Sequence, residues 1–172
     1  MKSVLMSIQP KWCELIASGK KTIEVRKTKP KLETPFKVYI YATKSGDRLV
    51  LKSDKVFEIS RAITGKVIGE FVCERISEPP YLSNIVTLYG TRNTYAPFSD
   101  ELNASCLTIG ELNNYGKGNS IYFWHISNLV IYDKPKELNN FYKPTLPTFL
   151  RYEDDVIKRP PQSWCYVESE SE

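Results

Sequence analysis

The chain has 172 residues, of which 41% are hydrophobic and 26% charged, a composition typical of one soluble globular domain with a buried core. No apolar run approaches the roughly 18 residues of a membrane span, and the N-terminus lacks the pattern of a signal peptide, so we expect a cytoplasmic protein without a membrane partner. Four well-separated cysteines and a single histidine argue against a zinc site, and no nucleotide-binding motif is present. We therefore expect no metal, no cofactor, and reduced thiols rather than two disulfides.

Positive charge is concentrated at the start of the chain. Residues 1–52 contain 12 Lys and Arg against 4 Asp and Glu, whereas the remaining 120 residues contain 12 against 16. A local excess of this size can attract phosphate groups. It is also compatible with an ordinary lysine-rich surface, so charge alone leaves both interpretations open.

The first predicted elements are a strand and a helix. Residues 3–8 form a short apolar run that predicts a buried strand. Pro10 suits the first turn of a helix, and Gly19 suits a left-handed stop after it. Three apolar residues share one face of this helix: Trp12, Leu15 and Ile16. We expect Trp12 in the core, although its ring could also stack on a base.

A strand with two unlike faces follows. Ile23 and Val25 point one way, whereas Glu24 and Arg26 point the other. Charged side chains therefore gather where this strand meets the helix and the turn at Lys21.

Two further strands are predicted in the middle of the chain. Residues 27–35 read as a loop and residues 36–43 as an alternating strand, in which Tyr39 and Tyr41 form either a stacking surface or an ordinary solvent-facing side. Residues 65–76 predict a long strand. Its alternation puts Val67, Phe71 and Cys73 on one face, and Ile68, Glu70, Val72 and Glu74 on the other.

Residues 45–64 and 78–118 interrupt the strand pattern. The first segment could hold a short strand or a helix. The second predicts a helix starting near Ser99 and another at Thr108, where Glu111 completes a capping box.

The last third of the chain predicts more strands. Residues 121–126 and 129–132 read as two strands linked at Ser127-Asn128, and residues 134–138 as a helix or loop. Residues 159–167 read as an extended segment that packs back onto the domain, before an acidic tail at 168–172. The sum is an α+β, mainly β fold, because strands dominate and no regular βαβ alternation is present. Periodicity alone does not distinguish a barrel from a sandwich.

The opening motif resembles that of a known family. From Ser7 to Arg26 the chain reads S-I-x-P-x-W-x-x-x-I-x-x-G-x-K-x-x-E-x-R, which is similar to the start of the ASCH domain. The likeness is strong over residues 4–44 and weaker over residues 65–76 and 119–133. It implies a PUA-like small β-barrel with short flanking helices, as a single domain over residues 1–167 with insertions at about 45–64 and 78–118. It also implies nucleic-acid binding, with RNA as the expected partner.

Lys21, Glu24 and Arg26 are the principal candidate site residues. A carboxylate braced by a guanidinium can accept hydrogen bonds from a base edge, and a lysine at the turn offers a phosphate contact. The alternative is a structural ion pair. The residues expected to contact nucleic acid are Ser7, Lys20, Lys21, Glu24, Arg26, Lys27 and Lys44. Ser7 could instead cap the helix.

Three functions are compatible with these residues. The first is a nucleic-acid-binding module with a basic rim for phosphates and a cleft for a base. The second is a hydrolase acting on RNA (a ribonuclease) or on a modified nucleoside, similar to N4-acetylcytidine amidohydrolases, with Lys21, Glu24 and Glu70 as catalytic candidates. Lys21 matches the lysine of those enzymes, but Glu24 stands where they have a threonine, which favours binding over catalysis. The third is protein interaction through residues 78–118.

Overall fold

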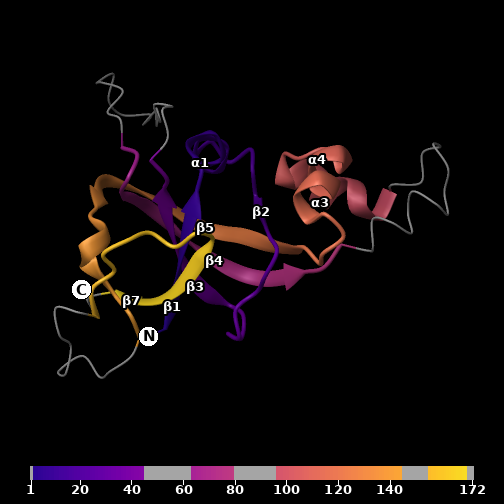
Figure 1. The fold of residues 1–172 in the computed structure, drawn as a ribbon. Helices are drawn as coiled ribbons and strands as arrows, with labels where there is room; N and C mark the ends of the chain where they lie inside the picture. Colours follow the sequence, from indigo (N-terminus) through magenta and orange to yellow (C-terminus); the bar gives the residue numbers. More distant parts are fainter. Residues whose placement is uncertain (1, 45–62, 80–95, 145–154, 170–172) are drawn as a thin grey trace, which may run out of the picture.

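The computed structural model describes residues 2–44, 63–79, 96–144 and 155–169. Its strands form one seven-stranded sheet in the order β2-β5-β4-β3-β1-β7-β6, in which β1 and β3 run parallel and the other neighbouring pairs antiparallel (Figure 1). The strands are β1 (Ser3–Ile8), β2 (Ile23–Arg26), β3 (Phe36–Ala42), β4 (Val67–Ser77), β5 (Tyr122–Lys136), β6 (Phe141–Tyr142) and β7 (Trp164–Ser169). The helices are α1 (Pro10–Ala17), α3 (Ala96–Ser105) and α4 (Ile109–Gly116), with a short 3-10 turn at Leu138–Asn140. The prediction of a mixed, mainly β fold is confirmed.

Strands β1 and β3, near the middle of the sheet, are covered on both faces. Val4, Met6 and Ile8 of β1 join the main core, whereas Leu5 between them joins a second cluster on the opposite face. Tyr39 and Tyr41 belong to this second cluster and are only 2% and 3% exposed. The sequence-based expectation that they face solvent or stack on a ligand is therefore wrong, since an alternating strand can be buried on both sides.

Helix α1 follows its predicted limits. Pro10 occupies the first turn, Cys13 and Ile16 are buried, and Gly19 has a φ of +73° just past the helix end. The N-cap is Gln9, without a side-chain cap. Ser7 instead donates a hydrogen bond from its hydroxyl to the carbonyl of Pro161, at 2.7 Å, so it does not cap the helix.

Helices α3 and α4 come from the segment predicted as an insertion, and they pack on β2. A third apolar cluster joins Ile23 and Val25 of β2 to Leu112 of α4, with Ile121 and Phe123 beside them. In Figure 1, α1 and α4 lie on either side of the β2 segment. The predicted capping box is confirmed: Thr108 and Glu111 exchange side-chain and backbone hydrogen bonds at the start of α4.

Two strand predictions need correction. Residues 122–136 form one long strand, not two strands followed by a helix or loop, because Asn128 takes a left-handed conformation (φ +45°) within the strand and does not end it. In β4 the predicted faces are wrong at the start, where pairing with β3 shifts between Ile40 and Tyr41. This irregularity puts Ile68 in the main core with Phe71, and Val67 in the second cluster.

The sheet is strongly curved. Three strands separate β2 from β1 in the sheet order, yet the Arg26 side chain on β2 reaches the Ser7 carbonyl at the end of β1, at 2.7 Å. This curvature brings both strands to one junction. All four cysteines are free, as expected, and no helix of the described residues is long and apolar enough to cross a membrane. The predicted segment 45–64 lies almost entirely outside the described residues, as do residues 80–95 of the second insertion and the end of the acidic tail.

Candidate functional site

The turn after α1 positions Lys21. The Gly19 N–H donates to the Ile16 carbonyl and the Lys21 N–H to the Leu15 carbonyl, both at 2.9 Å, so the chain folds back over the helix end. The next N–H, of Thr22, donates to the Ala104 carbonyl at 2.9 Å and thereby links the start of β2 to α3. Lys21 is consequently held between α1 and α3.

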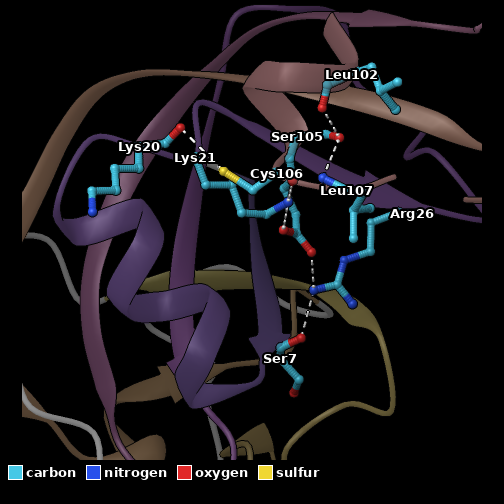
Figure 2. A network of polar contacts seen from close by, with 9 residues as sticks. Ser7, Lys20, Lys21, Arg26, Leu102, Ser105, Cys106 and Leu107 are labelled. Carbon is cyan, nitrogen blue, oxygen red and sulfur yellow. Dashed lines mark hydrogen bonds and ion pairs between the residues drawn. The ribbon is translucent and has the colours of Figure 1, made fainter. Parts of the chain in front are cut away.

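A chain of charges crosses the junction. The Lys21 ammonium donates to the Ser105 carbonyl at 2.6 Å and lies 3.5 Å from Glu24 Oε2. The Arg26 guanidinium pairs with Glu24 Oε1 at 3.0 Å and donates to the Ser7 carbonyl at 2.7 Å. Figure 2 shows these contacts running from the α3 end at Ser105, past Lys21, to Arg26 and Ser7. The network therefore joins β1, β2 and the C-terminal end of α3.

The three charged residues are buried. Lys21, Glu24 and Arg26 are 2%, 6% and 8% exposed. Burial lowers the pKa of Lys21, and the nearby Glu24 carboxylate opposes this shift. The predicted structural ion pair is thus present, but it does not use every polar atom. Within the described residues, Glu24 Oε2 and Arg26 Nε are buried without a hydrogen-bond partner, as is Trp124 Nε1 in the main core.

A cleft of about 610 Å³ opens beside this network. Of the residues predicted to contact nucleic acid, five line it: Ser7, Lys21, Glu24, Arg26 and Lys27. Trp12 also lines it, and this partly buried residue packs against the main core, as expected. The Lys21 and Lys11 ammonium groups lie 5.0 and 4.3 Å from the Trp12 ring centroid.

Three predicted site residues lie elsewhere. Lys20 and Lys44 are exposed and do not line the cleft. Glu70 on β4 pairs with Lys37 at 2.7 Å and accepts a hydrogen bond from the Tyr132 hydroxyl. Burial alone would raise the pKa of Glu70, but these two hydrogen bonds lower it. The structure does not bring Glu70 together with Lys21 and Glu24, so Glu70 is not a second carboxylate of the site.

One wall of the cleft was not predicted. It comes from the connection between α3 and α4 and from α4 itself, through Leu107, Glu111, Asn114, Tyr115 and Lys117. Tyr115 is 37% exposed, and the Lys27 ammonium lies 4.9 Å from its ring centroid. The capping box located this helix in the sequence, but no sequence signal placed it over β2. Leu112 of α4 packs against β2 in the third apolar cluster, so the described part of the second insertion contributes to the core.

The described structure is thus a mixed, mainly β protein with a polar cleft at the junction of β1, β2, α1 and α4. Residues 6–87 match the ASCH domain, which assigns this part of the chain to that domain family. This result confirms the family predicted from the opening motif. No curated protein matches the chain.

Solved structures with the same fold include an ASCH protein from Zymomonas mobilis. Its similarity has a TM-score of 0.56 at 19% identity and covers 98% of this chain and 89% of that chain. Two mutants of the same protein have TM-scores of 0.56 and 0.55 at 18% and 17% identity, over 98% and 96% of this chain and 91% and 88% of theirs. At these identities the likeness establishes a shared fold.

Proposed function

We propose that the protein binds single-stranded RNA in the cytoplasm and takes one unpaired base into the cleft beside Lys21, Glu24 and Arg26. The observation that carries this proposal is a pair of buried polar atoms without a hydrogen bond, Glu24 Oε2 and Arg26 Nε, on two residues that line the cleft. Buried polar groups are normally satisfied, so their unused capacity points to a ligand. The strong curvature of the sheet supports the finer assignment of a PUA-like barrel around this site.

The charge of the cleft fits an RNA segment. Its lining includes four cationic residues, Lys21, Arg26, Lys27 and Lys117, and two acidic ones, Glu24 and Glu111. Lys27 and Lys117 are exposed, whereas Lys21 and Arg26 are buried. The exposed lysines at the rim suit the phosphate backbone, and the buried groups suit a base edge.

A salt titration of binding to a short single-stranded RNA tests this proposal. We expect Lys27→Ala and Lys117→Ala each to weaken binding and to reduce the slope of log K against log salt by roughly 0.7. Lys134→Ala is the matched control, because Lys134 is exposed but lies outside the cleft. Absence of RNA binding at low salt would refute the proposal, as would equal losses in all three variants.

A hydrolase is the second candidate, because one observation favours it. Lys21 and Glu24 are buried side by side at 3.5 Å in an open cleft, and burial lowers the pKa of the lysine. Such a pair can act as stabilising cation and general base. Incubation with N4-acetylcytidine and with RNA tests this function, with Lys21→Ala as the control. Turnover that disappears in the variant would establish the enzyme, and no turnover with either substrate would argue against this function.

A further inference from the structure

Two atoms below the cleft have unused hydrogen-bonding capacity. Glu24 Oε2 accepts no hydrogen bond, and its charged neighbour is the Lys21 ammonium at 3.5 Å. Arg26 Nε donates none: the guanidinium contacts Glu24 Oε1 and the Ser7 carbonyl through Nη2, and Nη1 donates to the Ser163 hydroxyl at 3.4 Å. The carboxylate oxygen needs a donor and the Nε–H needs an acceptor. A bound group that satisfies both must therefore offer a donor and an acceptor side by side.

The charged residues form an ordered set. Glu24 lies between two cations, with Lys21 on its Oε2 side and Arg26 on its Oε1 side. Lys21 uses one N–H on the Ser105 carbonyl and has others to offer. The set therefore has the order donor, acceptor, donor. Its complement is a ligand edge with the order acceptor, donor, acceptor.

We propose that the cleft selects a cyclic imide edge, –CO–NH–CO–, which uracil alone presents among the four RNA bases. This inference rests on the proposed RNA-binding function and names the base that the site prefers. The uracil N3–H donates to Glu24 Oε2, and the two flanking carbonyls accept from Lys21 and Arg26. Guanine would place a second donor against a cation, and cytosine and adenine lack a donor between two acceptors.

The same charged groups exclude phosphate from the floor of the cleft. Phosphate oxygens offer acceptors and negative charge, which Glu24 repels. The phosphate backbone therefore stays at the rim with Lys27 and Lys117. Because Glu24 Oε2 and Arg26 Nε are covered in the free protein, an entering base must displace the side chains that cover them.

The experiment compares RNA pentamers binding to the full wild-type chain by fluorescence anisotropy at low salt. The probes are oligouridine, oligocytidine, oligoadenosine and oligo(N3-methyluridine), in which a methyl group replaces the central donor. We expect oligouridine to bind roughly 5- to 150-fold tighter than the other three, the discrimination usual for a well-matched pair of hydrogen bonds to a base. Equal binding of uridine and N3-methyluridine pentamers would overturn the imide assignment and leave RNA binding intact. Failure of every probe to bind would overturn the proposed function itself.

A pair of variants tests whether Glu24 is responsible for the preference for uridine. Glu24→Gln keeps the side-chain size but turns one oxygen into an N–H donor, so the ratio of uridine to cytidine affinity should fall towards one. Glu14→Gln is the matched control, because Glu14 is exposed on α1 and does not line the cleft. Circular dichroism establishes that both variants fold. An unchanged ratio in folded Glu24→Gln would overturn the assignment, and the probe comparison with wild-type protein stands independently of either variant.

Discussion

Replacing Glu24 by Ala should strongly destabilise the fold, because it leaves two buried cations without their shared counter-charge. Glu24 lies 3.0 Å from Arg26 and 3.5 Å from Lys21, and its side chain is 7% exposed. With an effective dielectric constant near 20, each pair has a gross Coulomb energy of about 5 kcal/mol. Desolvation offsets much of this attraction in the native protein, but the variant keeps the desolvated cations and loses the attraction.

The expected net loss in the free energy of unfolding is about 3–5 kcal/mol. For a chain of this length, that loss lowers the midpoint of thermal unfolding by roughly 10 °C. Circular dichroism melts at neutral pH measure the shift. Lys21→Met should cost less than Glu24→Ala, because it removes a buried charge and keeps the Glu24–Arg26 pair.

The matched control is Glu78→Ala. Glu78 pairs with Lys29 at 2.7 Å, a shorter distance than either Glu24 pair, but both partners are about half exposed. Its removal should leave the melting midpoint almost unchanged, because solvent screens exposed pairs. If Glu24→Ala shifted the midpoint no more than this control, burial would not control the energetics of the junction and the reasoning would fail.

Three further predictions concern binding, pH and packing. Tyr115→Ala should weaken RNA binding roughly 5- to 150-fold and Tyr115→Phe much less, because an exposed aromatic ring at the cleft can stack on a base; equal losses in an anisotropy titration would instead implicate the hydroxyl. Burial lowers the pKa of His125, so its unfolded form binds a proton more readily and stability should fall as the pH decreases from 7 to 5. Melts of His125→Gln should show a weaker dependence over this range, and an unchanged dependence would contradict the assignment. Gly69→Ala should cost about 1–3 kcal/mol, because its Cβ would lie 2.3 Å from the Val130 carbonyl oxygen across the β4–β5 pair. Denaturant titration measures this loss, and Gly110→Ala, whose nearest neighbour is 4.0 Å away, should show none.

Local sequence patterns predicted most elements correctly. Pro10 and Gly19 bounded α1, and the Thr108–Glu111 pair located α4, because capping depends on residues three or four positions apart. The same local rules failed at Asn128, where a left-handed residue was read as a break between two strands. A strand stays continuous through such an irregular residue when the strands on both sides still pair with it. Those partner strands cannot be read from the strand's own sequence.

The grouping of the candidate site residues was also predicted only in part, and again it was correct for the residues close together in the sequence. Lys21, Glu24 and Arg26 were identified as a group because they lie within six residues around one turn. Lys44 and Glu70 were chosen from strand positions, and neither lies at the cleft. Ends of different strands meet or diverge according to sheet order and curvature, which a single strand does not encode.

The sequence by itself determined the limits of α1, the start of α4, the charged face of β2 and the family of the opening motif. Only the tertiary structure decided that the charges are buried and what faces them. Lys21 meets the Ser105 carbonyl 84 residues later, and Tyr115 closes the cleft from a helix that nothing in its own pattern assigns to β2. The physical reason is that an apolar face must be covered, but apolar contact is not directional, so the choice of cover belongs to the packing of the whole chain.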